Sequence, residues 1–308
     1  MNSIESLKSE FNSQIRELNH IHTEKLFDNC IFVGSGDSYV AGLMVEYSTD
    51  HKCVCYSASD LSNSRLDDDK TYCFISATGR TKANIELARR AKERGIKTIA
   101  VTANTNSKLA QECKRIVPLN LKRVKGPIAA FDTFTTIVVT CLQIAGLAVP
   151  QKFDTWYSNG IELSQKFLDS KTLIEMIDKG TVFIFGNNML YPLALYASLK
   201  MTEFFGTTAV AHKLEEFCHS PVFGIKKSHQ LWILGQNEKP VAQKLSQLGL
   251  KLSYIELYNQ DIMSQLFVSI FFVQNLMLLL AEKYGYTELN YLMMKDVLKV
   301  SSDIIYFE

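Results

Sequence analysis

The sequence lacks an excess of charge of either sign. Its 308 residues include 33 Lys and Arg against 32 Asp and Glu, which gives a formal net charge of +1. A protein that binds nucleic acid or an anionic membrane surface through electrostatics needs a basic face. The balanced composition therefore predicts no nucleic-acid partner, and we expect a charged ligand to be held by local groups.

The sequence also lacks the continuous apolar stretch of a signal peptide or a membrane span. Residues 1–22 are polar, with apolar residues at a helical period, so no export segment is predicted. The apolar segment 262–281 approaches spanning length, but Ser, Gln or Asn interrupts it about once per turn. We therefore expect a buried core or dimer-interface helix there, no membrane partner and a cytoplasmic location.

Cysteine is arranged neither as a disulfide framework nor as a metal site. The seven cysteines are an odd number, and several lie in apolar runs where a reduced thiol behaves as a small hydrophobic residue. Cys53 and Cys55 form a C-x-C pair without a second pair of ligands nearby. Core packing is the favoured interpretation, and neither a metal nor another cofactor is predicted.

What the sequence does contain is an alternation of short apolar runs and helical patterns. In the first half, apolar runs occupy 30–34, 52–57, 71–76, 97–103 and 115–119, and helical patterns occupy about 38–48, 81–94, 105–113 and 131–147. In the second half, apolar runs occupy 181–186, 230–235 and 252–257, with a long helix at about 190–205. This alternation is typical of doubly wound parallel sheets, and the length favours two domains. We predict an α/β fold with two Rossmann-like domains of flavodoxin type, 1–150 and 151–308.

The two halves repeat one pattern. Gly34 and Gly186, 152 residues apart, close equivalent apolar runs, and a helix containing Ala, Leu, Met and Tyr follows each of them. Two fused copies of one fold explain this better than two unrelated domains.

The first candidate binding turn is the segment GSGDS at 34–38, between an apolar run and a helix. Small residues such as Gly36 let backbone N–H groups approach an anion at the helix N-terminus, and Ser38 adds a hydroxyl. A nicotinamide cofactor is the alternative. It is disfavoured because the G-x-G-x-x-G fingerprint fails, the next glycine after Gly36 being Gly42.

The second candidate turn is the segment SATGRT at 76–81, which closes an apolar run and opens a helix. The hydroxyls of Ser76, Thr78 and Thr81, together with the helix dipole, can hold a phosphomonoester. A nucleotide triphosphate would need a Walker lysine and an acidic magnesium ligand, which are not found here. An ordinary capping turn is the alternative, but two such turns at the carboxyl edge of one sheet favour a phosphate site.

A third group of candidates lies in the second half. Lys200 and Glu203 are three residues apart on the predicted helix and share a face. A surface ion pair is the plain alternative, but the flanking residues are apolar, which predicts a pair at the edge of a buried surface where the pKa of a carboxylate can be raised. His219, before Ser220 and Pro221, is either part of this site or a structural histidine.

These segments resemble a known family. The strings IFVGSGDSY, FISATGRT, KTIAVTANTNSKLAQECKRIVPL and LYPLALYASLKMTEFF…EEFCHSP resemble the two SIS (sugar isomerase) repeats of the isomerase domain of glucosamine-6-phosphate synthase and of stand-alone phosphosugar isomerases and deaminases. The resemblance spans about residues 28–300 and implies two tandem SIS domains. It departs at Ala77, at the turn 126–130 and in the tail, which lacks the usual Pro-Arg, so the substrate is left open.

The resemblance implies a role for each candidate residue. The sugar phosphate would be held by Gly36, Ser38, Ser76, Thr78 and Thr81. Glu203 would move the proton between C1 and C2, and Lys200 falls on the family's helix lysine. His219, sixteen residues after Glu203, would reach in from a partner subunit to assist ring opening, which implies a homodimer with shared active sites. Lys295 of the C-terminal tail, with Lys299 as the second candidate, would lie at the sugar.

Two functions follow. The first is an isomerase that interconverts ketose and aldose, or amino-aldose, 6-phosphates such as fructose 6-phosphate and glucosamine or glucose 6-phosphate. The second is a non-catalytic phosphosugar sensor or regulatory protein. The combination of Glu203, His219 and Lys295 favours the enzyme. Neither a glutaminase domain nor a DNA-binding extension is expected, because the sequence starts at its first helix without an N-terminal cysteine nucleophile.

Overall fold

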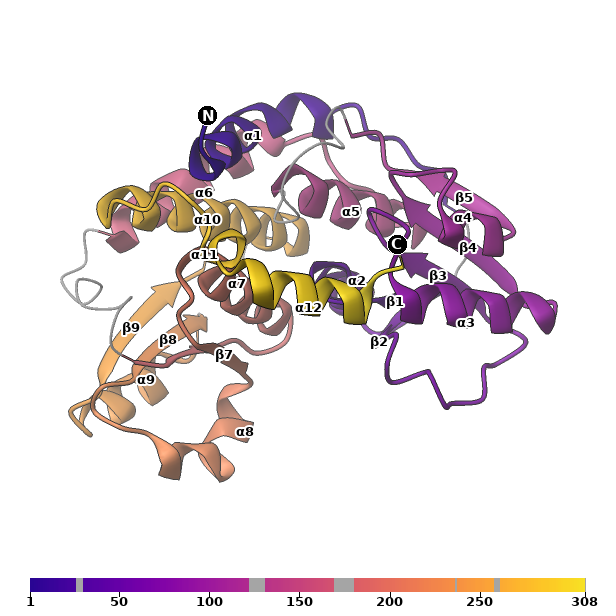
Figure 1. The fold of residues 1–308 in the computed structure, drawn as a ribbon. Coiled ribbons are helices and arrows are strands. Elements are labelled where there is room, and N and C mark those ends of the chain that lie inside the picture. Colours follow the sequence, from indigo (N-terminus) through magenta and orange to yellow (C-terminus); the bar gives the residue numbers. More distant parts are fainter. Residues whose placement is uncertain (26–29, 122–130, 169–179, 236, 258–260, 308) are drawn as a thin grey trace. The chain divides into compact units, whose positions relative to one another are not determined.

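Figure 1 shows the computed structural model, which describes residues 1–25, 30–121, 131–168, 180–235, 237–257 and 261–307. The chain forms two compact units. Unit 1 contains Met1–Asn12 and Lys152–Met293, and unit 2 contains Ser13–Gln151 and Met294–Glu308. The changeover after Gln151 lies next to the division at residue 150 predicted from the sequence. In addition, unit 1 is formed mainly by the second half of the chain but includes the N-terminal residues. Unit 2 is formed mainly by the first half but includes the C-terminal residues.

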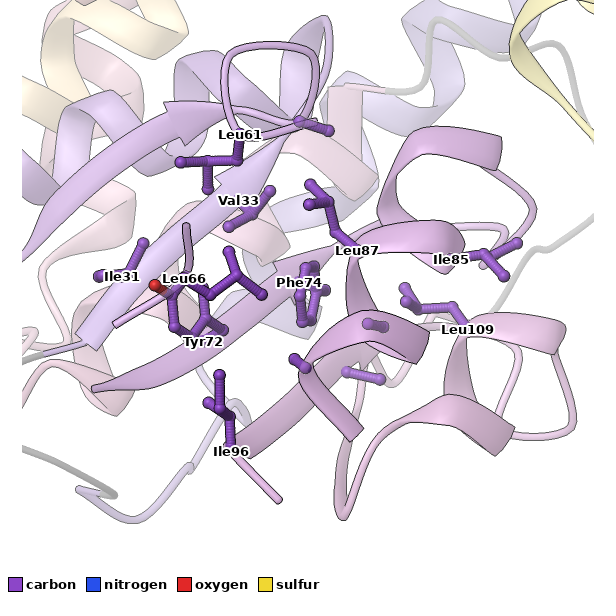
Figure 2. Close-up of a cluster of buried hydrophobic side chains, with 14 residues drawn as sticks. Ile31, Val33, Leu61, Leu66, Tyr72, Phe74, Ile85, Leu87, Ile96 and Leu109 are labelled. Carbon is purple, nitrogen blue, oxygen red and sulfur yellow. The ribbon is translucent and has the colours of Figure 1, made fainter. Parts of the chain in front are cut away.

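Unit 2 is built on a five-stranded parallel sheet. In spatial order its strands are β2 (Val54–Ser57), β1 (Cys30–Gly34), β3 (Thr71–Ile75), β4 (Lys97–Thr102) and β5 (Arg115–Pro118). Its helices include α2 (Asp37–Ser48), α3 (Lys82–Glu93), α4 (Lys108–Glu112), α5 (Phe131–Ile144) and α12 (Lys295–Ile305). Every residue of β1 and β3 is buried, which is why both read as continuous apolar runs. Figure 2 shows side chains of these strands, such as Val33 and Phe74, clustered with Leu87 of α3 and Leu109 of α4.

Unit 1 is built on a four-stranded parallel sheet. In spatial order its strands are β7 (Ala209–His212), β6 (Val182–Phe185), β8 (Gln230–Gly235) and β9 (Lys251–Glu256). Its helices include α6 (Phe153–Leu168), α7 (Leu190–Phe205), α8 (Leu214–His219), α9 (Lys239–Ser246), α10 (Ile262–Lys283) and α11 (Asn290–Met293), and a 3-10 turn covers Pro221–Gly224. Helix α1 (Ser3–Leu18) begins in this unit and ends in unit 2. The sequence did not reveal β7, because it is a short edge strand whose four residues are all only half-buried.

The two sheets share one topology, which confirms the predicted α/β fold with two parallel sheets. In chain order, the first four strands of each unit lie in the arrangement 2-1-3-4, as in flavodoxin-type sheets. The glycines that close β1 and follow β6 are needed for the same reason. A Cβ on Gly34 would lie 2.6 Å from the backbone of Ser38, and one on Gly186 would lie 2.0 Å from the carbonyl oxygen of Leu190. In both units, therefore, the strand runs directly under the first turn of the following helix.

Helix α10 is a core helix of unit 1. It is long and apolar enough to cross a membrane, but 78% of its most apolar 18-residue window is buried within the structure. Ser264, in its first turn, is bonded within the unit: the side chain of Asp261 accepts the N–H of Ser264 and caps the helix. The indole N–H of Trp156, on α6, donates to the hydroxyl of Ser264 at 2.8 Å. The polar interruption at Ser264 is thus a hydrogen-bonding contact within the unit.

Candidate functional site

The strand order brings the two predicted binding turns to neighbouring strand ends in unit 2. Strand β1 lies between β2 and β3, so the chain leaves β1 toward one side of the sheet and returns on the other. In parallel α/β sheets, a ligand crevice opens at the carboxyl ends of the strands where this reversal occurs. The turn 34–38 follows β1 and the turn 76–81 follows β3. Both turns therefore follow strands at this reversal, where the fold class is expected to bind a ligand.

The first turn presents the start of α2. Gly36 is exposed and has φ 57°, a left-handed conformation that favours glycine, and it precedes the helix without a capping side chain. Ser38 is half-buried in the first helical turn. Backbone N–H groups at a helix start that no capping side chain satisfies are suitable donors to an anion.

The second turn brings two of its three hydroxyls together. The Ser76 hydroxyl lies 3.1 Å from the Thr81 hydroxyl and accepts the backbone N–H of Gly79 at 3.1 Å. The Thr78 hydroxyl makes a different contact: it accepts the N–H of Arg80 at 3.4 Å. Thr81 precedes α3, yet its side chain makes no capping bond to that helix. Ser76 and Thr81 thus form a hydroxyl pair at a helix N-terminus.

Asn84 and Thr102, which the sequence analysis missed, form hydrogen bonds with the backbone at this second turn. The amide of Asn84 donates to the carbonyl of Ile75 at 2.9 Å, and the hydroxyl of Thr102 donates to the carbonyl of Ala77 at 3.2 Å. Gly79 has φ 65°, and a Cβ there would lie 2.1 Å from the hydroxyl of Ser107. Thr102 could have been found from the sequence, because it places a hydroxyl at the end of β4, the strand beside β3.

Unit 1 holds the Lys200–Glu203 pair on α7. The ammonium group of Lys200 lies 2.6 Å from the carboxylate of Glu203, and the side chains are 1% and 30% exposed. The Lys200 ammonium also lies 5.4 Å from the centre of the Tyr196 ring. The pair therefore sits at the edge of a buried surface rather than on an open helix face. This arrangement fixes a partly accessible carboxylate beside a buried positive charge.

A hydrogen-bonded pair at the end of the unit 1 strands holds the helix that carries His219. Asn187, just after β6, accepts the N–H of Leu214 at 3.2 Å at the start of α8. The amide of Asn187 also donates to the carboxylate of Glu238, beyond β8, at 3.1 Å. His219 is the last residue of α8 and is exposed. The sequence analysis missed both members of this pair, which are 51 residues apart.

The predicted site residues are divided between the two units. Unit 2 contains Gly36, Ser38, Ser76, Thr78, Thr81 and Lys295, and unit 1 contains Lys200, Glu203 and His219. Lys295 is exposed and is the first residue of α12. The turn 126–130, where the family resemblance departs, lies outside the described residues.

The sequence comparisons agree with this fold. Residues 28–146, which lie in the first half of the chain, match the SIS domain family. Among its sequence relatives is the isomerizing glutamine–fructose-6-phosphate aminotransferase of Mycolicibacterium paratuberculosis, 24% identical over 218 residues, which are 63% of this chain and 34% of that protein. The chain thus spans about a third of the length of the relatives it matches.

Solved structures extend the similarity to both units. Glucosamine-6-phosphate deaminase from Thermotoga maritima aligns with a TM-score of 0.76 at 19% identity, covering 93% of this chain and 96% of that chain. The C-terminal domain of glucosamine-fructose-6-phosphate aminotransferase from Francisella tularensis aligns with a TM-score of 0.66 at 18% identity, covering 89% and 93%. Tagatose-6-phosphate ketose/aldose isomerase from Escherichia coli aligns with a TM-score of 0.64 at 15% identity, covering 92% and 89%. At these identities the likeness concerns the fold alone, an α/β fold with two parallel sheets.

Proposed function

We propose that this protein is a phosphosugar isomerase that interconverts a ketose 6-phosphate with an aldose or amino-aldose 6-phosphate. The hydroxyl pair of Ser76 and Thr81 carries this proposal, because it stands at a helix N-terminus beside the topological reversal of unit 2. The names of the structural relatives, which include a deaminase and an isomerase of hexose phosphates, support the same substrate class.

In the proposed binding mode, unit 2 holds the phosphate group. Gly36 and Ser38 would offer donors from the start of α2, and Ser76, Thr78 and Thr81 from the turn before α3. A phosphate dianion suits two helix N-termini, because their dipoles favour negative charge and their first N–H groups need acceptors. The balanced net charge of the chain is compatible with this mode, since no extended basic surface is needed.

In the proposed chemistry, the Glu203 carboxylate transfers the proton between C1 and C2 of the open-chain sugar. A general base must lie within hydrogen-bond reach of the proton that it removes. It must also be deprotonated before the transfer. Lys200 would orient this carboxylate through the 2.6 Å contact. Lys295 would lie at the sugar, and His219 would assist ring opening from a partner subunit. These side chains perform an enediol-type transfer without a cofactor.

We further propose a homodimer with shared active sites and a cytoplasmic location. The shared site follows from the role given to His219, which is exposed at the end of α8 and so is accessible to another subunit. All seven cysteines are free, in agreement with a reducing compartment.

Product analysis tests the proposed reaction. The purified protein is incubated with fructose 6-phosphate, with and without ammonium, and the products are identified. Glucosamine 6-phosphate formed with ammonium would show aminating chemistry, and glucose 6-phosphate formed without it would show simple isomerisation. Binding without turnover would favour the sensor function instead.

A binding experiment tests the phosphate site separately. Each lost hydrogen bond to a charged group costs about 1.5–3 kcal/mol, so the Ser76→Ala, Thr81→Ala double variant should bind fructose 6-phosphate at least tenfold more weakly in calorimetric titration. Ser62→Ala is the control. It removes an exposed hydroxyl that donates to the carbonyl of Ser59. Equal affinity of the double variant and the wild type would show that the phosphate binds elsewhere.

A further inference from the structure

The last residues of the chain pair with the second binding turn. Tyr306 forms an antiparallel β-bridge with Thr81, and the backbone N–H of Phe307 donates to the carbonyl oxygen of Arg80 at 3.0 Å. All of these residues belong to unit 2, and Figure 1 shows the C-terminus beside the start of α3. The backbone of the turn is therefore held from one side by Tyr306 and Phe307, which we call the strap.

Aromatic side chains of the tail strengthen this attachment. The guanidinium of Arg80 lies 5.4 Å from the centre of the Tyr306 ring. The ammonium groups of Lys82 and Lys108 lie 5.7 Å and 4.8 Å from the centre of the Phe307 ring. Phe307 also packs against the buried cluster drawn in Figure 2. Cation–π contacts of this kind add to the apolar burial, so the tail is anchored by its side chains as well as by its backbone.

The residue that the tail holds is the one whose hydroxyl completes the candidate phosphate site. Thr81 contributes its backbone to the bridge and its hydroxyl to the 3.1 Å contact with Ser76. A helix N-terminus binds an anion well only when its turn keeps the donors in place before the ligand arrives. From inside unit 2 the turn is fixed by Thr102 and Asn84, and from outside it is fixed by the tail.

We propose that Tyr306 and Phe307 are positioning residues that preorganise the phosphate-binding turn 76–81. This inference rests on the proposed phosphosugar function of that turn. Loss of the tail would then lower the affinity for a sugar phosphate, and by linkage a bound sugar phosphate would hold the tail more firmly. Lys295, at the other end of α12, lies about 16 Å along the helix axis from the strap. The pairing of Tyr306 with Thr81 therefore also attaches α12, which carries Lys295, to the turn 76–81.

Substitutions at Phe307 separate the backbone contact from the side-chain contacts. Phe307→Ala removes the ring but keeps the N–H, whereas Phe307→Pro removes both the ring and the donor to Arg80. A chain that ends at Ile305 removes the whole strap. Val300→Ala, on an exposed side chain of α12, is the matched control. Thermal unfolding of each variant without ligand establishes that unit 2 is folded.

Calorimetric titration with fructose 6-phosphate decides between the outcomes. We expect the shortened chain and Phe307→Pro to bind at least fivefold more weakly than wild type, Phe307→Ala to fall between them and wild type, and Val300→Ala to bind as wild type does. In a Thr81→Ala background, shortening the chain should have a much smaller effect, because the strap acts through that residue. A merely structural role of the tail would not produce this dependence on Thr81.

Two further results would count against the inference in different ways. If wild type binds fructose 6-phosphate and the shortened chain binds it equally well, the strap does not position the turn, and the proposed function stands. If wild type binds no hexose 6-phosphate, the proposed function falls and the strap inference falls with it. A protease assay checks the linkage: fructose 6-phosphate should slow the removal of Phe307 by a carboxypeptidase in wild type but not in the Ser76→Ala, Thr81→Ala variant.

Discussion

Replacing Glu203 with Gln tests stability as well as chemistry, because Lys200 depends on that carboxylate. The substitution leaves the Lys200 ammonium, 1% exposed, beside a neutral amide instead of an anion 2.6 Å away. Breaking a buried ion pair by removing one partner costs about 3–5 kcal/mol. Glu203 keeps 30% of its side chain in contact with water, and water weakens such a pair. We therefore expect a loss near the lower limit, about 3 kcal/mol.

Urea unfolding followed by circular dichroism measures this loss. Wild type, Glu203→Gln, Lys200→Met and the double variant are compared, and only midpoint shifts at unchanged slope are converted to free energy. The double variant should be more stable than Glu203→Gln, since it no longer buries an ammonium group that has lost its carboxylate. Glu162→Gln is the matched control: it breaks the 2.5 Å pair with Lys166, whose side chains are 69% and 63% exposed, and should change little.

The outcome bears directly on how a loss of activity is interpreted. If Glu203→Gln unfolds at the same urea concentration as wild type, the buried pair does not stabilise unit 1 and the electrostatic reasoning given for Lys200 is refuted. If it is destabilised as expected, turnover must be measured where the variant is still folded. A fall in rate of about 10²–10⁴ under those conditions is the signature of a lost general base.

Three further predictions concern the site, the core and the thiols. A Glu203→Gln chain and a His219→Ala chain, each inactive alone, should regain activity when they are refolded together, and heterodimers that form without activity would contradict a shared site. Asp261→Ala should lower the free energy of unfolding by about 1 kcal/mol through loss of the α10 cap. Hydrogen bonds from the first turn of α10 lower the pKa of Asp261, so this difference should be present above pH about 3.9 and should shrink as the pH falls through the folded-state pKa. In native protein a thiol reagent should modify the exposed Cys218 rapidly, whereas burial raises the pKa of Cys113 to about 12 and should make it slow. Rapid modification of several thiols in folded protein would contradict that burial.

The sequence predicted the features that depend on local pattern. The first-half strands β1 and β3 are buried on both faces, so each appears as an unbroken apolar run that needs no tertiary information. The positions of Gly34 and Gly186 likewise showed the repeat, because a close approach between strand and helix excludes any other residue there. The hydroxyls of Ser76 and Thr81 could be placed together, because they flank one strand-to-helix turn.

The remaining features depend on contacts between distant segments. Asn187 and Glu238 are ordinary polar residues in sequence, and their bond exists only because β6 and β8 are neighbours. The edge strand β7 carries too little buried surface to give an apolar run. The attachment of Phe307 to Arg80 joins the end of the chain to its first third, and no periodicity encodes such a contact.

The exchange of chain ends between the units has a consequence for synthesis. Unit 1 includes Met1–Asn12, whose Ser3 hydroxyl accepts the N–H of Leu289 at 2.8 Å, and unit 2 includes Met294–Glu308. During translation the strands of the unit 2 sheet are made early, but α12 and the residues that pair with the turn 76–81 are made much later. Ser3, within the first twelve residues, cannot bond Leu289 until that residue is made almost three hundred residues later. Neither unit can complete its contacts until segments far apart in the sequence have both been made, and separately expressed halves would each lack a segment of their own unit.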